Sequence, residues 1–277
     1  MARKYLQRAI ERFQAALGHF GAVDDDLNMA RVWSQLGAVA QQMSNLTEAE
    51  RCYRQALPLT EKAGDPMAQA QTHMRLGQLS ELAGRPDEAA EGYTRAIRIY
   101  QDRQARAALM TAEMAMAELL LRQGDLVGAQ VHAEASRSAA ESLESDFEPW
   151  GVYALLQRIA QAAGDQERVA LWRARTQESF AKAPEAEAVR QRWHTLIEAV
   201  CRSCRGEALD MVAVETMEKL EASEDWERLA LAIWRVLGGE RGSDLYADLD
   251  HVDALIIRTI LEAIERPDAA GGEDREE

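Results

Sequence analysis

Two cysteines and one histidine are the residues of this sequence whose types and spacing suggest metal or redox chemistry. Cys201 and Cys204 form a Cys-x-x-Cys pair, and His194 lies seven residues before Cys201, a spacing that puts both on one helical face. A zinc site normally has four ligands, and the sequence has no second cysteine pair. A thioredoxin-like role requires a βαβ setting, which the surrounding pattern lacks. We therefore predict neither a metal nor a cofactor, and interpret the thiols as small side chains packed at a helix end.

The remaining histidines and cysteine do not form a catalytic pattern. His19, His73, His132 and His251 are scattered, and the sequence contains neither a glycine-rich phosphate loop nor a nucleophile elbow. Cys52 is the only other cysteine, so the spacing of a disulfide framework is missing. The sequence therefore predicts a protein that is not an enzyme, and a reducing, cytoplasmic location.

The charge distribution argues against nucleic acid as a partner. The formal net charge is -15, and residues 181–277 supply -11 of it, with 12 Lys and Arg against 23 Asp and Glu. A phosphate-binding protein needs a basic face, which this chain does not offer. We interpret the acidic surface mainly as a source of solubility.

No segment of the sequence has the length and apolarity of a membrane span. Glu113, Glu118 and Arg122 interrupt the most apolar region, which lies around residues 119–121. Near the start of the sequence, Glu11 interrupts the chain before the apolar core of a signal peptide can develop. The sequence therefore predicts a protein without a membrane-spanning helix.

The elements that must position these residues recur every forty residues. When the sequence is aligned on this period, equivalent positions form columns of like residues. In one pair of columns a large apolar residue is followed by a small one, and in a later set alanine, an aromatic residue and alanine follow at spacings of four and three. A further column, in the predicted turns, is rich in glycine. These columns contain Leu36-Gly37, Leu76-Gly77 and Met116-Ala117; Ala49, Tyr53 and Ala56; Ala89, Tyr93 and Ala96; and Ser44, Gly84, Gly124 and Gly164. A small residue lets a second helix approach closely, and the alanine-aromatic-alanine spacing forms one packing stripe on that helix. The pattern predicts stacked helical hairpins.

With these columns, the sequence resembles a tetratricopeptide repeat (TPR) protein. Trp33-x-x-Leu36-Gly37 matches the opening of the TPR motif, and Trp193-x-x-Leu196 repeats it four periods later. The forty-residue period resembles the longer variety of kinesin-light-chain-like and bacterial regulatory TPR proteins. The third repeat departs from the motif, with Glu113 in the slot of a large residue and Ala133 in the aromatic slot.

We therefore predict an all-α fold, a TPR-type helical-hairpin solenoid with a helical C-terminal cap. The solenoid is assigned to residues 1–182, a degenerate repeat and the helical cap to 183–266, and a disordered acidic tail to 267–277. The expected helices are 2–20, 28–43, 47–63, 67–83, 87–102, 106–122, 126–143, 149–163, 166–181, 184–205, 207–222, 224–237 and 251–265. Ser223 and Asp250 are the expected N-caps of the last two helices, and Pro267 is expected to stop the last one.

The resemblance implies that the first helix of each hairpin lines a groove for a partner segment. The residues of these helices that lie away from the packing stripe are the expected partner-binding residues: Arg31, Ser34, Gln35, Gln71, Met74, Arg75, Gln78, Met114, Glu118, Arg122 and Arg158. Their arginines can pair with carboxylates, and their amides and thioethers make adaptable contacts. The alternative for the arginines and glutamines is that they only solvate a helix face.

The leading functional interpretation is a scaffold or adaptor that binds a protein or peptide segment with some acidic character. The alternative is a regulatory subunit that tethers or controls an enzyme or a cytoskeletal filament through its acidic C-terminal module. An enzyme that uses the face of His194, Cys201 and Cys204 is the third class. The sequence does not predict the partner's identity or the oligomeric state.

Overall fold

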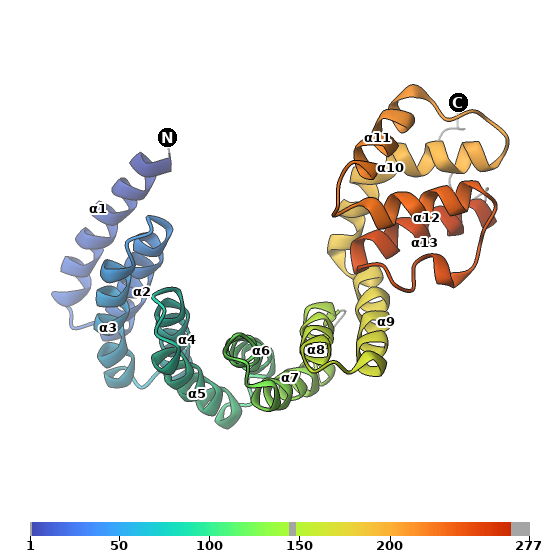
Figure 1. Ribbon diagram of the computed structural model, residues 1–277. Coiled ribbons are helices and arrows are strands. Elements are labelled where there is room, and N and C mark those ends of the chain that lie inside the picture. The colour runs from blue at the N-terminus through green and yellow to red at the C-terminus, as the bar shows by residue number, and fades with distance from the viewer. Residues whose placement is uncertain (1, 144–147, 267–277) are drawn as a thin grey trace. The chain divides into compact units, whose positions relative to one another are not determined.

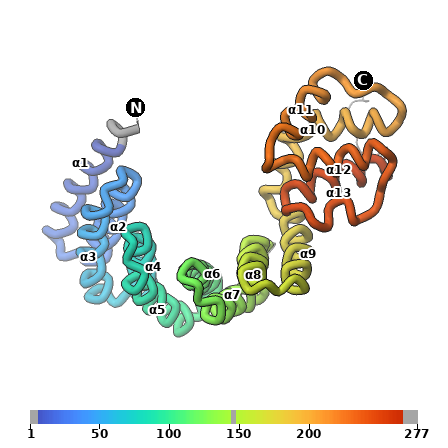
Figure 2. Tube along the Cα trace, in the orientation of Figure 1, coloured from blue at the N-terminus to red at the C-terminus, as the bar shows by residue number. Residues whose placement is uncertain are grey.

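The computed structural model describes residues 2–143 and 148–266, and side chains from residue 6 onward. Those residues form thirteen α-helices and one short 3-10 helix and contain no strand (Figures 1 and 2), which confirms the predicted all-α fold. The chain divides into two compact units, Met1–Glu144 and Ser145–Glu277. The first contains α1 (Ala2–Gly21), α2 (Asp26–Gln42), α3 (Leu46–Lys62), α4 (Pro66–Leu82), α5 (Pro86–Asp102), α6 (Arg106–Gln123) and α7 (Leu126–Glu141). The second contains α8 (Trp150–Ala162), α9 (Gln166–Lys182), α10 (Pro184–Cys204), α11 (Met211–Glu221), α12 (Glu227–Leu237), η1 (Ser243–Leu245) and α13 (His251–Glu265).

The helices of the first unit form a solenoid of hairpins. Its main contacts pair α2 with α3, α4 with α5, and α6 with α7, and each hairpin also packs on the one before it. Figure 1 shows these antiparallel helices following one another along the first unit. The predicted boundaries of α2 to α7 agree with the structure to within two residues.

A left-handed residue recurs in the turns at intervals of twenty residues. Positive φ angles are found at Asp24, Ser44, Gly64, Gly84, Gln104, Gly124 and Gly164. Glycine adopts this conformation without the steric cost that a side chain adds, which accounts for the glycine-rich turn column. The turn inside a hairpin and the turn between two hairpins therefore have the same backbone geometry.

A tyrosine packed on a glycine holds each of the first two hairpins together. Tyr93 is buried on α5, and a Cβ atom added to Gly77 on α4 would lie only 2.7 Å from its ring. Tyr53 and Gly37 have the same relation in the preceding hairpin. The Tyr93 hydroxyl donates a hydrogen bond of 2.9 Å to Glu81. The Leu-Gly and aromatic columns of the sequence thus describe one contact.

The third hairpin replaces this contact with polar side chains. Glu113 on α6 is 3% exposed, and its carboxylate lies 2.6 Å from Nδ1 of His132 on α7. Gln101 donates a longer hydrogen bond of 3.5 Å to the same carboxylate. The hydroxyl of Ser136, also buried, donates to the Met110 carbonyl at 2.9 Å. The helices α6 and α7 still pack as extensively as α2 and α3.

The second unit begins with a hairpin and continues with a differently connected bundle. The helices α8 and α9 pair in sequence, but the main partner of α10 is α13 rather than the adjacent α11. The core between these helices contains Val200, Met217, Ile233 and Ile257. The α9 side chain of Gln177 donates hydrogen bonds to the carbonyls of Tyr246 and Leu249 in the segment before α13.

The boundary between the two compact units differs from the predicted domain boundary between residues 182 and 183. That prediction marked the end of regular repeats in the sequence, whereas the division by contacts falls at Glu144 and Ser145. The helix α9 packs against α13, so it shares a core with the C-terminal helices. The predicted tail at 267–277 and the helix stop at Pro267 lie outside the described residues.

The start of α12 differs from the sequence prediction. The expected N-cap, Ser223, instead begins a turn, because its carbonyl accepts the amides of Trp226 and Glu227. The helix starts at Glu227 without a side-chain cap. The other predicted cap is confirmed, since the Asp250 carboxylate accepts the amides of Val252 and Asp253 at the start of α13.

Candidate functional site

A cleft between α2 and α4 brings together five of the predicted partner-binding residues. Its volume is about 250 Å³. The lining residues are Ala30, Arg31, Ser34 and Gln35 of α2, Thr60 of α3, Asp65 before α4, and Met67, Ala68, Gln71, Thr72 and Arg75 of α4. Equivalent turns of two neighbouring first helices thus form the walls of what we call the α2–α4 cleft.

Two arginines supply the positive charge of the α2–α4 cleft. Arg31 and Arg75 are exposed, and neither forms an ion pair with any residue that the structure describes. Arg31 donates only a long hydrogen bond of 3.4 Å to Asn28, and the Arg75 guanidinium lies 6.0 Å from the centroid of the Tyr53 ring. Both charges are therefore available to a ligand carboxylate.

The α2–α4 cleft also contains a carboxylate that the sequence prediction did not include. Asp65 is the N-cap of α4, and its side chain accepts the amide of Ala68 at 3.0 Å. The Asp65-Pro66 pair is a sequence signal for a helix start, so the position of Asp65 at the start of α4 could have been predicted. Because two arginines and one aspartate line the cleft, its formal charge is positive.

The other predicted residues have different environments. Met74 is only 7% exposed and packs with Tyr93 and Met116, so the expectation that its side chain faces a partner is corrected. Its position on α4 faces the next hairpin, which a single helix pattern does not reveal. Gln78 is exposed on α4 outside the α2–α4 cleft, and Met114 and Glu118 are half-buried on α6.

Arg122 and Arg158 differ from the two cleft arginines. The Arg122 guanidinium pairs with the Glu81 carboxylate, whose other oxygen accepts the Tyr93 hydroxyl. This network links α6 to α4, and burial together with the Glu81 hydrogen bond raises the pKa of Tyr93. Arg158 lies on α8, in the second unit, and is exposed.

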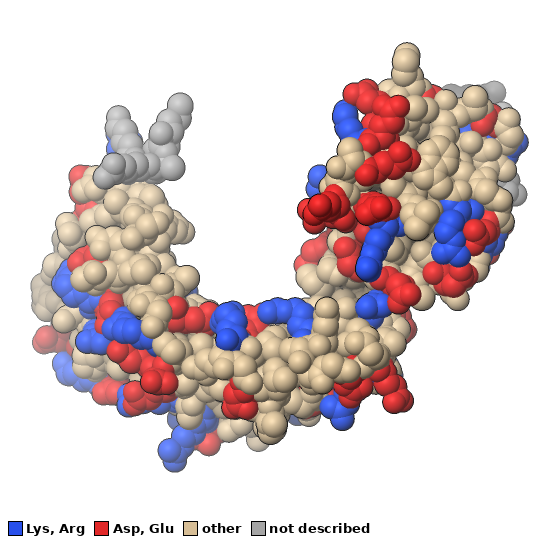
Figure 3. Space-filling view, viewed as in Figure 1, with Lys and Arg blue, Asp and Glu red and all other residues tan. Residues whose placement is uncertain are grey.

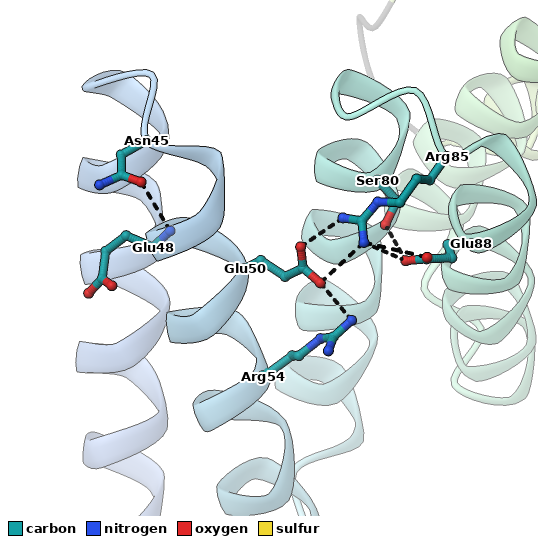
Figure 4. A network of polar contacts seen from close by, with 7 residues as sticks. All are labelled: Asn45, Glu48, Glu50, Arg54, Ser80, Arg85 and Glu88. Atoms are coloured by element: carbon teal, nitrogen blue, oxygen red, sulfur yellow. Dashed lines mark hydrogen bonds and ion pairs between the residues drawn. The ribbon is translucent and has the colours of Figure 1, made fainter.

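An ion-pair network fixes the second helices of the first two hairpins against each other. The Glu50 carboxylate on α3 forms ion pairs with Arg85, the residue before α5, at 2.7 Å and with Arg54 at 2.6 Å (Figure 4). Arg85 also pairs with Glu88 at 3.1 Å, and Ser80 donates to that carboxylate. The hydrogen bond from Arg85 lowers the pKa of Glu50. Since α3 supports α2 and α5 supports α4, the network helps to set the spacing of the cleft walls.

The cysteine and histidine residues that suggested metal chemistry are separated in the structure. Cys201 is buried and its thiol faces the Ile260 carbonyl at 3.8 Å, while the Cys204 thiol faces the Val236 carbonyl. His194 points elsewhere, with a side chain 66% exposed and paired with Glu198 at 3.4 Å. Burial raises the pKa of the Cys201 thiol. No group of three or more metal-binding side chains is found among the described residues.

All six tryptophans lie in the described residues, and five of them are half-buried and pack against other side chains. Trp150 stacks on His251 and meets Phe180 edge-on, and Trp193 lies 5.3 Å from Trp226. Trp234 is the exception, because 45% of its surface is exposed. In the part of the chain that the structure describes, no helix is long and apolar enough to cross a membrane.

Comparisons with known proteins agree with the hairpin architecture. The sequence model of the tetratricopeptide repeat matches residues 28–102, which include all but the first two residues of α2, the whole of α3 to α5 and the α2–α4 cleft. The crystal structure of BtubC (BKLC) from P. vanneervenii is similar to this chain with a TM-score of 0.61 and 18% sequence identity, over 65% of this chain and 75% of that one. No curated protein matches the sequence. The structural similarity concerns the fold, since the identity is low.

Proposed function

Because residues 28–102 match the tetratricopeptide repeat and the first unit is a stack of helical hairpins, we propose that the chain is a non-enzymatic scaffold or adaptor that binds a partner segment along the first helices of its hairpins. Repeats of this family generally mediate protein–protein interactions. Stacked hairpins present a row of first helices to a partner, and the α2–α4 cleft is one position along that row.

The observation that carries the proposal is the pair of arginines in the α2–α4 cleft. Arg31 and Arg75 lie on neighbouring first helices and have no carboxylate partner among the described residues. Around them, Ser34, Gln35 and Gln71 supply hydroxyl and amide groups that can donate or accept hydrogen bonds. A partner segment with one or two carboxylates and exposed backbone groups matches this chemistry.

The proposal includes a reducing, cytoplasmic environment. Its support is that Cys52, Cys201 and Cys204 are free thiols. Two of them are buried in the packed core. An oxidising compartment would favour paired cysteines in a secreted protein.

A displayed library of random peptides, selected on the wild-type protein, tests the proposal. We expect the enriched peptides to carry net negative charge and to bind with measurable affinity by fluorescence anisotropy. Arg31→Ala with Arg75→Ala should weaken the best peptide at least about tenfold, since hydrogen bonds to charged groups contribute about 1.5–3 kcal/mol each.

The matched control removes two arginines from a second helix. Arg98 and Arg103 are exposed at and near the end of α5, outside the α2–α4 cleft, and form no ion pair with a described residue. Arg98→Ala with Arg103→Ala changes the net charge equally and should leave the affinity within about twofold. Equal weakening by both pairs, or selected peptides without acidic residues, would contradict the proposal.

The second candidate function is a regulatory subunit that acts through the acidic C-terminal module. It is favoured by the negative charge of residues 181–277. A truncation at the predicted boundary of 182 and 183 is a poor test, because it would break the Gln177 hydrogen bonds to Tyr246 and Leu249. Substitutions in the full chain, as described below, separate the two candidates better.

A further inference from the structure

Exposed apolar side chains concentrate on two adjacent helices of the second unit. Among the described residues, ten large apolar side chains are exposed, and five of them lie on α11 and α12: Met211, Val212, Val214, Leu231 and Trp234. Single exposed apolar residues are common on protein surfaces, but a concentration of them marks an interaction surface.

One stripe of α11 combines these apolar side chains with carboxylates. Met211, Val214, Glu218 and Glu221 follow one another at spacings of three, four and three residues, so they lie on one helical face. Trp234 joins them from α12, because its indole Nε1 donates a hydrogen bond to Glu221. We call these five residues the α11–α12 face. Met211 is 85% exposed there.

The charge around the α11–α12 face is strongly negative. Residues 207–227 contain eight Asp and Glu against Lys219 as the only basic residue. Lys219 is paired with Glu215, and Asp210 is paired with Arg202. Glu218 and Glu224 form no ion pair with any described residue. Figure 3 shows mostly acidic side chains over α11 and its connection to α12.

We propose that the α11–α12 face binds a basic amphipathic segment of a partner protein. Lysines or arginines of the segment pair with Glu218 and Glu224, and its apolar side chains cover Met211 and Val214. A cation beside the exposed Trp234 ring adds a cation–π contact. The surface thus recognises a partner of opposite charge from the one proposed for the α2–α4 cleft, and it does not depend on that proposal.

The same charges exclude the other common occupants of an apolar face. A second copy of this chain, placed face to face, would bring Glu218 and Glu224 of both copies together, and like charges across an interface cost binding energy. Nucleic acids and anionic lipid surfaces are repelled for the same reason. A basic protein segment satisfies both the apolar and the acidic groups.

A labelled Lys/Leu amphipathic peptide of about four helical turns is the probe. It is titrated against the full-length protein by fluorescence anisotropy, beside one peptide with Glu in place of Lys and another with Ala in place of Leu. We expect only the Lys/Leu peptide to bind at the α11–α12 face, with an affinity that falls as salt increases. Hydrogen exchange should show protection of α11 and α12 amides in the complex.

Two sets of variants locate the binding. Glu218→Lys with Glu224→Lys should weaken the Lys/Leu peptide at least about tenfold, and Trp234→Ala about fivefold. The matched control is Glu262→Lys with Glu265→Lys, two exposed residues at the end of α13, which should change the affinity less than about twofold. Arg31→Ala with Arg75→Ala should have no effect, which separates this surface from the α2–α4 cleft.

Several outcomes would overturn the proposal. Equal weakening by both Glu→Lys pairs would mean that net charge alone attracts the peptide. Equal binding of the Lys/Ala peptide would mean that Met211, Val214 and Trp234 take no part. Absence of binding, or sedimentation showing a dimer that the Glu218 and Glu224 changes dissociate, would mean that the surface has a different occupant.

Discussion

The hairpins α4–α5 and α6–α7 reach similar packing by different means. In α4–α5 the Tyr93 ring fills the space above Gly77, where a Cβ atom would not fit. In α6–α7 the corresponding residues are Ala133 and Ala117, both fully buried, so two small residues replace a ring and a glycine. The lost aromatic contact is accompanied by the buried Glu113 carboxylate and its partner His132.

This difference shows which part of the repeat is fixed. The extent of packing between the two helices is retained, while the side chains at this level change from apolar to polar. A buried carboxylate is tolerated there because His132 and Gln101 both contact it. The hairpin architecture therefore constrains the combined volume and the satisfied hydrogen bonds at this level, and not the residue type alone.

The largest expected effect comes from removing the Tyr93 ring of α4–α5, which has no counterpart in α6–α7. Tyr93→Ala should destabilise α4–α5 by about 3–5 kcal/mol, because the removed ring would leave a cavity between α4 and α5. Amide hydrogen exchange of α4 and α5 measures the loss. Tyr93→Phe is the control and should cost about 0.5–1.5 kcal/mol, the value of the hydrogen bond to Glu81. A loss below about 1 kcal/mol for Tyr93→Ala would mean that the ring is not needed for the spacing.

A second buried carboxylate, Asp253 on α13, sharpens the comparison because one of its oxygens lacks a partner. Asp253 is 3% exposed, and Oδ1 has no hydrogen-bond partner among the described residues. Burial, with the nearby Asp250 charge, raises its pKa from 3.8 to about 7. The folded protein therefore binds this proton more tightly than the unfolded chain does. The stability it supplies is complete below pH 3.8 and is lost as the pH rises to about 7.

Asp253→Asn should remove this dependence. Between about pH 4.5 and 6.5 the wild type should lose about 3 kcal/mol relative to the variant, from about 1.4 kcal/mol per pH unit. Hydrogen exchange of α13 amides at a series of pH values measures the difference. Comparing the two proteins at each pH cancels the opposite contribution of His251, whose pKa is lowered by burial. Parallel pH profiles would contradict the assignment.

Removing the partner of the satisfied carboxylate tests the polar half of the comparison. His132→Ala should destabilise α6–α7 by about 1–3 kcal/mol, because Glu113 would keep its burial and lose its closest hydrogen bond. The double substitution Glu113→Leu with His132→Ala should recover part of this loss, since no buried charge remains. Thermal unfolding and exchange of α6 and α7 amides would show it. If the double variant is the less stable one, the carboxylate stabilises the hairpin by itself.

The smallest expected effect comes from adding one methyl group to α4–α5. Gly77→Ala should cost about 1–2 kcal/mol despite its better helix propensity, because the new Cβ would approach the Tyr93 ring and the Ala89 carbonyl. In a Tyr93→Ala background, the same change should be neutral or stabilising, as in the Ala117 and Ala133 arrangement. A double-mutant cycle measures the coupling. Additive effects would show that the two positions do not share one space.

The sequence predicted the hairpins because the same contacts recur. Leu76-Gly77 and Tyr93 each had counterparts forty residues away, so pattern and period together indicated helices, turns and their pairing. Beyond α10 the period no longer helped, and Ser223 was interpreted as a cap although its carbonyl forms a turn instead. Nor did the sequence indicate that α10 packs mainly on α13, because that contact occurs once and joins segments far apart in the chain.

The candidate site was predictable where it depends on one helix and not where it depends on two. Arg31 and Arg75 were identified from their helical positions, and both line the α2–α4 cleft. Arg122 had the same kind of position, but it pairs with Glu81 on another hairpin. Met74 is buried for a related reason, since α5 and α6 cover it. The sequence also identified Glu113 as a departure without indicating that His132, nineteen residues later, would be its partner.

The left-handed residues that return at positions such as 24, 44, 64, 84, 104 and 124 make the single helix the unit of chain geometry, whereas the hairpin is the unit of packing. Excising forty residues between two equivalent turns would shorten the stack and keep every remaining side chain on its original side. Excising twenty would join helices of the same class in succession, turning exposed positions inward and packing positions outward. Growth or loss of the array in evolution is therefore expected in whole pairs of helices.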